Sequence, residues 1–234
     1  MINDRESYKW AVIGAGPAGI AALGQLMDHG VSKNDIIWID PRFKVGDFGL
    51  YWSEVSSNTK VQLFTDFLNK CKAFNYDKRN KNFELDNLPG NDTCKLSIMV
   101  EPLEFVTKQL QGQVKYFEQT VTKINLSDRL WHLTMHDKTV LSTKNVILAT
   151  GATPRSMPLT PGVETISIYD ALNTAKLAQR INENDRVAVF GASHTAIMLL
   201  RDILDLGAKE VINFYREPLR FAVPMDNWYC YLGT

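Results

Sequence analysis

The sequence predicts an α/β protein with two parallel-sheet βαβ units in tandem and a small β-meander between them. Three observations predict this class. Two similar phrases, WAVIGAGPAGI (10–20) and VAVFGASHTAI (187–197), each place an apolar run before a glycine turn and a helical pattern. A second apolar run follows each helical pattern. Between the phrases, short segments such as RLWHLTM (129–135) alternate apolar and polar residues, as hairpin strands do.

The first phrase contains the parts that a dinucleotide-binding unit needs, in the required order. Residues 9–13 read as a buried strand, and a helix then runs to about His29. Glycines at G-x-G-x-x-G spacing lie between them: Gly14, Gly16 and Gly19. The first glycine would allow a tight turn, the second would let the backbone approach a pyrophosphate, and the third would let the helix pack against the strand.

Other residues of this unit are candidates for the same ligand. Pro17 and Ala18 begin the helix, whose N-terminus favours phosphate. The second strand, DIIWID (35–40), ends in Asp40, which lies 21 residues after Gly19. An acid at this distance can accept hydrogen bonds from an adenosine ribose. Pro41 follows it directly and is a further candidate.

The second phrase predicts a second unit with altered glycines. Gly191 is retained, Ser193 stands at the middle position and Ala196 at the third, where alanine is an accepted substitute. The Ser193 hydroxyl can donate to a phosphate oxygen, and His194 and Thr195 complete the candidate turn. A degenerate unit that keeps its shape but binds poorly is the alternative.

The segment after the meander, ILATGATPRSMPLTPG (147–162), resembles the crossover of the two-dinucleotide-binding-domain flavoproteins. The resemblance implies a tandem Rossmann-like, three-layer fold. Residues 1–157 would form an FAD-binding domain, with an insertion at 41–112 and a meander at about 120–143. Residues 158–234 would form an NAD(P)-binding domain. Thr150 and Gly151 in the crossover and Trp52 in the insertion are added to the FAD-site candidates.

Within the insertion, GLYWSEVSSNTKVQLFTDF (49–67) resembles the flavin-containing monooxygenases and their N-hydroxylating relatives. The matching residues are Ser57-Asn58, Lys60, Phe64 and Asp66-Phe67. The resemblance implies that Asn58 lies beside the reactive edge of the flavin as the catalytic residue. An amide there can donate and accept hydrogen bonds in a dry pocket. A structural asparagine in a turn is the alternative reading of this residue alone.

Two motifs of related branches are missing. PGVETISIYDAL (161–172) lacks the Phe-x-Gly and the histidine that the monooxygenase fingerprint carries between the two folds. The three cysteines form neither the CxxC nor the CxxxxC that disulfide reductases need beside the flavin, and they show no metal-ligand spacing. These differences leave a monooxygenase-like flavoprotein or a general pyridine-nucleotide oxidoreductase.

The second strand of the second unit predicts the nicotinamide donor. EVINFY (210–215) does not end in an acid and runs into REPLR (216–220). Arg216 and Arg220 can pair with a 2′-phosphate, whereas an acid would repel it. We therefore expect NADPH over NADH. Glu217, between the arginines, can pair with either of them or contact the ribose itself.

Composition excludes several classes of partner. The chain has 234 residues, 26 Lys and Arg against 26 Asp and Glu, and no apolar run of membrane-spanning length. Neither nucleic acid nor a membrane is therefore expected as a partner. The polar N-terminus and the scattered cysteines favour a cytoplasmic protein. The chain ends soon after the second strand of the second unit, so we expect an incomplete second fold whose open sheet edge favours a homo-oligomer.

The sequence thus predicts an FAD-dependent, NADPH-linked oxidoreductase of a monooxygenase-like kind, acting on a small molecule. Hydride would pass from NADPH to FAD before oxygen is activated. A flavin reductase or oxidase without oxygenation is one alternative. A truncated, non-enzymatic nucleotide-binding protein is the other.

Overall fold

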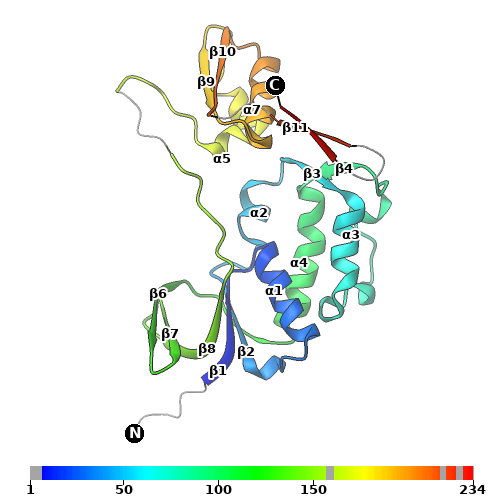
Figure 1. Cartoon of the computed structure of the whole chain (residues 1–234), viewed down its shortest axis with the longest axis vertical. Helices are drawn as coiled ribbons and strands as arrows, with labels where there is room; N and C mark the ends of the chain where they lie inside the picture. The colour runs from blue at the N-terminus through cyan, green and yellow to red at the C-terminus, as the bar shows by residue number, and fades with distance from the viewer. Residues whose placement is uncertain (1–6, 157–160, 217–219, 225–228, 234) are drawn as a thin grey trace. The chain divides into compact units, whose positions relative to one another are not determined.

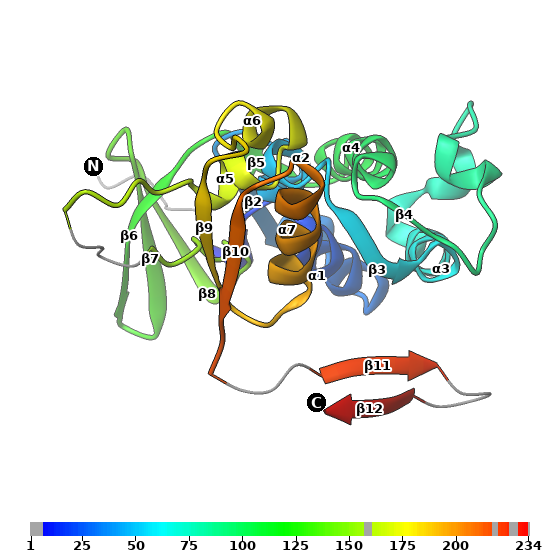
Figure 2. The same ribbon diagram turned by 90° about the horizontal axis from the view of Figure 1, so that it is seen from above.

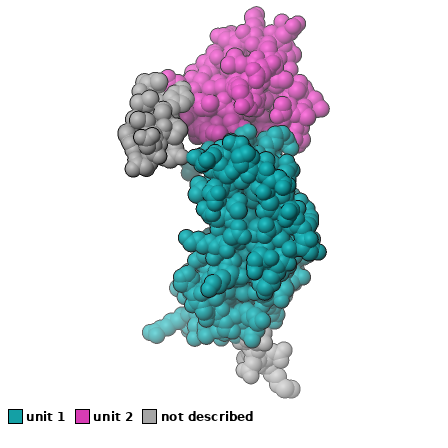
Figure 3. Space-filling model, turned by 90° about the vertical axis from the view of Figure 1, so that its right-hand side faces the viewer, with its two compact units in different colours: residues 1–155 teal, residues 156–234 magenta. Residues whose placement is uncertain are grey.

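A computed structural model describes residues 7–156 and 161–216, and the backbone of 220–224 and 229–233. The chain divides into two compact units, Met1–Arg155 and Ser156–Thr234. Figure 3 shows the two units in different colours. Each unit is described by itself below.

The first unit carries most of the secondary structure (Figure 1). In chain order its strands and helices are β1 (Ser7–Ile13), α1 (Pro17–Asp28), η1 (Lys33–Asp35), β2 (Ile36–Ile39), α2 (Gly46–Tyr51), β3 (Ser56–Lys60), α3 (Val61–Lys70), η2 (Lys72–Phe74), η3 (Tyr76–Lys78), η4 (Glu84–Asn87), β4 (Thr93–Lys95), α4 (Ser97–Gln111), β5 (Lys115–Phe117), β6 (Val121–Ser127), β7 (Leu130–Met135) and β8 (Val140–Leu148).

Six of these strands form one sheet in the order β5-β2-β1-β8-β7-β6. The pairs β5·β2, β2·β1 and β1·β8 are parallel, and β8·β7 and β7·β6 are antiparallel. The chain leaves β1 toward β2 on one side and later returns to β8 on the other. The strand order therefore reverses between β1 and β8, the place where parallel α/β sheets bind ligands outside their carboxyl ends.

Two buried apolar clusters, one on each face of the sheet, hold together three layers: the helices, the parallel strands and the meander. Helices α1 and α4 lie on one face of the sheet, where Val12 and Trp38 belong to the same buried cluster as Leu23 of α1 and Val106 of α4 (Figure 1). The alternate strand residues face the other way. Ala11, Ile13, Ile37 and Ile39 are buried there with two residues of the meander, Leu133 and Met135. The predicted α/β class with a meander is confirmed.

Helix α1 begins and ends where its residue types dictate. Gly16 is the N-cap, Pro17 occupies the first helical position, and the helix ends at Asp28 before Gly30, whose φ is +85°. A Cβ on Gly24 would lie 2.5 Å from the Cys71 sulfur and from the Phe74 ring. Glycine at this position therefore lets the insertion pack directly against the helix.

The second unit contains α5 (Ile168–Ala171), α6 (Thr174–Ala178), β9 (Arg186–Phe190), α7 (His194–Asp205), β10 (Glu210–Phe214), β11 (Arg220–Pro224) and β12 (Tyr229–Gly233). Strands β9 and β10 are parallel, and α7 connects them and packs on both (Figure 2). This is the second βαβ unit that the sequence predicts, so the tandem arrangement is also confirmed. Strands β11 and β12 form a separate antiparallel pair.

Two buried acids in the first unit predict a loss of stability at alkaline pH. Burial, followed by the hydrogen bond and charge of Asp28, raises the pKa of Cys71 from 9.0 to about 11. Burial, followed by the charge of Asp86, raises the pKa of Tyr76 from 10.0 to about 12. The unfolded chain releases both protons first, so their contribution is complete below pH 9 and disappears as the pH rises to 12. Each shift corresponds to about 3 kcal/mol of unfolding free energy.

Urea unfolding at about pH 8 and about pH 11 measures this loss. Cys71→Ala and Tyr76→Phe should each show a smaller decrease than the wild type. Among the described residues the Tyr76 hydroxyl has no hydrogen-bond partner, so Tyr76→Phe should cost little at pH 8. If the unfolding free energy decreases equally in the wild type and in both variants, these two groups do not cause the loss of stability at alkaline pH.

Candidate dinucleotide sites

The first glycine turn joins β1 to α1, and protein packing alone requires two of its three glycines. Gly14 has a φ of +109°, and a Cβ there would overlap the Ala149 carbonyl. A Cβ on Gly19 would overlap the Gly14 carbonyl. These two glycines therefore let the strand, the helix and the end of β8 approach one another.

Gly16 differs, because the protein around it has no need of a glycine. Its φ and ψ are −77° and 179°, which any residue adopts. A Cβ there would meet only Val45 O at 3.8 Å and Gly46 Cα at 3.9 Å, which are ordinary contacts. Gly16 also caps α1 without a side chain, so the first-turn amides have no side-chain acceptor there. A ligand that approaches the backbone, as a pyrophosphate does, would account for the missing Cβ, and this role of Gly16 stays a prediction.

Asp40 follows β2 and is only 8% exposed. Its Oδ2 accepts the Ala15 N–H at 2.8 Å. Its Oδ1 accepts the N–H groups of Arg42 and Phe43 at 2.8 and 2.7 Å. The carboxylate therefore ties the glycine turn to the loop after β2, a function that its position in the sequence did not indicate. Its predicted contact with an adenosine ribose stays a prediction.

The structure adds three residues to the turn that the sequence did not single out. The Trp38 indole donates from Nε1 to the Gly14 carbonyl at 2.9 Å. Val45 and Gly46 both have positive φ and lie against Gly16. A buried valine at φ +56° is strained, and such strain concentrates at binding sites. An indole within the aliphatic strand IIWI was the available sequence signal, whereas nothing in the sequence marks the strain at Val45.

The crossover after β8 reaches the same turn. Ala149 N donates to Ile13 O at 2.8 Å, which continues the β1·β8 pairing to the glycines. Thr150 is exposed, and its nitrogen would lie 3.3 Å from a Cβ on Gly14. Gly151 has a φ of +68° and open space around it. Thr150 therefore lies beside Gly14 at the point where the strand order reverses.

The second glycine turn repeats the geometry of the first. Gly14 N donates to Ile39 O and Gly191 N donates to Phe214 O, both at 2.8 Å. Ser193 is the N-cap of α7 with φ −86° and ψ 173°, matching Gly16, and its hydroxyl makes no capping bond. Its exposed hydroxyl is thus available to a ligand at the helix N-terminus. His194 and Thr195, which the sequence analysis assigned to the turn, are the first two residues of α7.

This correspondence identifies the second unit's counterpart of Asp40. Because Phe214 corresponds to Ile39, Tyr215 occupies the Asp40 position, and it is 54% exposed. The counterpart of Pro41 is Arg216, which is also exposed. Arg220 is the first residue of β11, but its side chain and Glu217 lie outside the described residues. Whether the two arginines act together therefore stays a prediction.

The predicted catalytic residue lies on a short ribbon. Asn58 is in β3, which pairs with β4 through an irregular register between Ser56 and Lys60. Its side chain is exposed. Ser57 makes the local turn, because its hydroxyl accepts the Thr59 N–H at 2.8 Å. Asn58 is thus not needed for that turn, and its catalytic role stays a prediction.

Two other FAD-site candidates lie on either side of α2. Pro41 is exposed in the loop after β2, and Trp52 is half-buried at the C-terminal end of α2. The Trp52 ring packs edge-on against Tyr51, with 6.2 Å between centroids. Their contact with a cofactor also stays a prediction.

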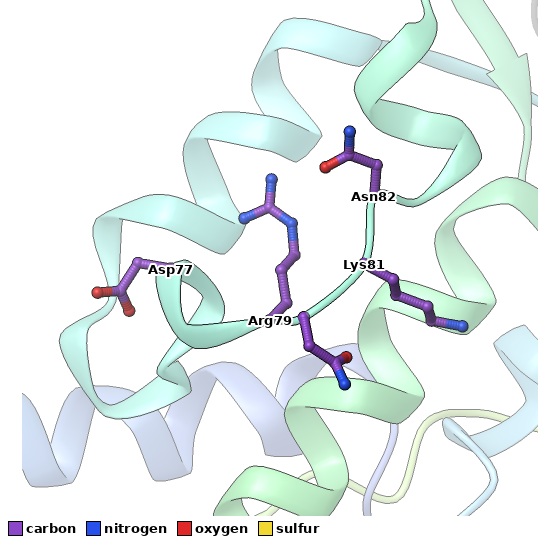
Figure 4. A pocket seen from close by; sticks show the side chains of 5 residues that line it. Asp77, Arg79, Lys81 and Asn82 are labelled. Atoms are coloured by element: carbon purple, nitrogen blue, oxygen red, sulfur yellow. The ribbon is translucent and has the colours of Figure 1, made fainter.

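A hollow of about 520 Å³ lies in the insertion, lined by Asp77, Arg79, Asn80, Lys81 and Asn82 (Figure 4). Arg79 pairs with Asp86 at 3.1 Å, and Lys81 pairs with Glu101. Both cations are thus already neutralised by acids of the same unit. This hollow is not part of the glycine turn of its unit.

Two glycine turns of one geometry, each following a parallel strand, define a protein of the two-dinucleotide-binding-domain class. The chain belongs to the pyridine nucleotide-disulphide oxidoreductase family, whose sequence model matches residues 8–225. It is 29% identical over 241 residues to monooxygenase AgnR1 of Paecilomyces divaricatus. That alignment covers 93% of this chain and 61% of the relative, so the chain spans about three fifths of the relative's length.

Solved structures share the fold at low identity. OTEMO in complex with FAD and NADP superposes with a TM-score of 0.54 at 18% identity, over 90% of this chain and 39% of its own. Bacillithiol disulfide reductase from Staphylococcus aureus gives 0.58 at 14% identity, over 90% and 58%. A cyclohexanone monooxygenase variant from Rhodococcus bound to NADP+ gives 0.55 at 18% identity, over 95% and 41%. None of the described helices is long and apolar enough to cross a membrane.

Proposed function

We propose that this protein is an FAD-dependent, NADPH-linked oxidoreductase, with FAD at the first glycine turn and NADPH at the second. The observation that carries the proposal is the repeated turn. Gly16 and Ser193 have the same extended backbone and the same position before a helix, and neither side chain caps that helix. A pyrophosphate at each position would receive the first-turn amides. The FAD and NADP of the similar solved structures support this pairing of ligands.

Each unit would bind through its own residues. In the first, Asp40 and Trp38 hold the turn while Gly16 leaves room for the phosphates. In the second, Ser193 would donate its hydroxyl and Arg216 would meet the 2′-phosphate. Bound FAD supplies the electron transfer, which no amino-acid side chain provides.

We further propose a monooxygenase-like reaction, in which reduced cofactor reacts with dioxygen. The named relative AgnR1 is a monooxygenase, and the segment containing Asn58 resembles that branch. The described cysteines do not favour thiol chemistry. Cys71 and Cys94 are buried, and burial raises the pKa of both thiols, which disfavours the reactive thiolate.

A flavin reductase or oxidase is the second candidate function. A monooxygenase must keep water away from the oxygen that its reduced cofactor activates, so it needs a dry site. The side chain of Asn58 is exposed, which favours the reductase or oxidase. The two candidates differ in what happens to electrons from NADPH when no substrate is present.

Asn58→Ala distinguishes these candidates. If Asn58 restrains the oxygen reaction, hydrogen peroxide release without substrate should rise several-fold in the variant, with FAD content and anaerobic reduction by NADPH unchanged. Asn69→Ala, an exposed asparagine on α3, is the matched control and should behave as the wild type. Peroxide release that is already fast in the wild type and equal in Asn58→Ala would support the oxidase instead.

A further inference from the structure

The two glycine turns share a third feature, a buried or half-buried donor on the second strand. In the first unit Trp38 lies opposite Val12, two residues before Gly14. In the second unit Asn213 lies opposite Val189, two residues before Gly191. Asn213 Nδ2 donates to Gly191 O at 2.9 Å and to Val189 O at 3.0 Å. An indole and a carboxamide thus occupy equivalent register positions, and each bonds to the carbonyl of the first glycine of its own turn, Gly14 or Gly191.

A hydrogen bond to the carbonyl of the first glycine orients the whole peptide group to which that carbonyl belongs. The carbonyl of each first glycine and the next N–H belong to one planar peptide group, so a bond to the oxygen also sets the direction of the N–H. In the first turn Trp38 holds the Gly14 oxygen and Asp40 holds the Ala15 N–H. That peptide cannot rotate without breaking two bonds. The amides that follow it, at Gly16 and in the first turn of α1, are thereby held in place for a phosphate.

Packing alone does not account for these donors. Trp38 has no exposed surface, so it cannot touch a ligand, and its ring would pack equally well without the N–H. Asn213 lies in β10 between Ile212 and Phe214, where an apolar side chain would serve the strand better. A polar group at such a position stabilises the fold only through the bonds it makes.

We propose that Trp38 and Asn213 are equivalent positioning residues that preorganise the two phosphate-binding turns, Trp38 for FAD and Asn213 for NADPH. This inference rests on the proposed function. Removing either donor leaves its glycine carbonyl without that bond and lets the turn move. The effect should be confined to the ligand of the same unit.

The experiment measures binding and stability rather than turnover. FAD binding to the 234-residue chain stripped of cofactor is followed by flavin fluorescence, and NADPH binding to the FAD-loaded protein by calorimetry. Trp38→Phe keeps the ring and removes the donor, and we expect FAD affinity to fall about tenfold with NADPH affinity within about twofold of wild type. Asn213→Leu should show the reverse pattern.

Matched controls separate positioning from general loss of stability. Trp10→Phe trims another tryptophan that packs against the same core. Asn173→Ala removes the cap of α6 in the second unit, where Asn173 accepts the Lys176 N–H at 3.0 Å. Both should lower the melting temperature as much as the test variants without changing either affinity.

The possible outcomes separate a failure of the positioning role from a failure of the proposed function. A wild-type chain that binds neither ligand overturns both. A wild type that binds both, with Trp38→Phe and Asn213→Leu no weaker than their controls, overturns the positioning role and leaves the function standing. The positioning role is supported if Trp38→Phe weakens only FAD binding and Asn213→Leu weakens only NADPH binding. The two variants lie in separate units, so if one of them fails to fold, the other still tests the role.

Discussion

Gly16→Val is expected to abolish tight FAD binding while leaving the fold intact. The backbone at Gly16 is extended, and a Cβ there would meet only two ordinary contacts near 3.8 Å, so the protein accommodates a larger residue. The same side chain would occupy the space through which a pyrophosphate approaches. Losing two charge-assisted bonds of about 1.5–3 kcal/mol each weakens binding by roughly a hundredfold or more.

Two further variants make this expectation specific, with FAD content after desalting and melting temperature as the readouts. Gly14→Ala should fail to fold whether or not FAD is present, because its φ is +109° and the added Cβ overlaps the Ala149 carbonyl. Ser193→Val, at the same position in the second turn, should retain FAD. FAD content in Gly16→Val equal to that of the wild type would show that this turn does not hold the pyrophosphate.

Arg216→Ala is expected to weaken NADPH by roughly ten- to a hundredfold and NADH very little. A 2′-phosphate carries a double charge that a guanidinium can pair with bidentately. Arg216 is exposed after β10 in the position next to the Asp40 equivalent. Losing one such charge-assisted bond, worth about 1.5–3 kcal/mol, gives the expected change in affinity.

The comparison of both nucleotides by calorimetry checks this expectation. Arg201→Ala is the matched control, because it removes an exposed arginine of the same unit that pairs with Asp202 at 2.7 Å. Tyr215→Asp should shift preference toward NADH, since it restores an acid where NAD-preferring folds have one. Equal losses for the two nucleotides in Arg216→Ala, or a wild type that prefers NADH, would refute the assignment.

The sequence predicts the framework well because the framework depends on local patterns. Apolar runs, glycine spacing and helical periodicity lie within short windows, so β1, β2, β7, β10 and α1, which ends one residue before His29, follow from them. The parallel pairing of β1 with β8 joins segments far apart in the chain, and no local pattern predicts it.

The details of the turn depend on contacts between distant residues, which a sequence pattern does not record. Asp40 was expected to face a ribose, yet its carboxylate accepts three backbone N–H groups, one of them 25 residues away. The positive φ of Val45 and the bonds from Trp38 and Asn213 likewise arise from the folded chain. The reactive end of the site, including Asn58, depends on a cofactor and therefore stays a prediction.

Anaerobic titration of the FAD-loaded protein with NADPH, followed in the visible flavin bands, tests the central claim most directly. The account predicts a yellow protein after desalting, whose bands bleach as about one equivalent of NADPH is added and return when air is admitted. A protein that stays colourless after incubation with FAD, or bound FAD that NADPH does not bleach, would contradict it.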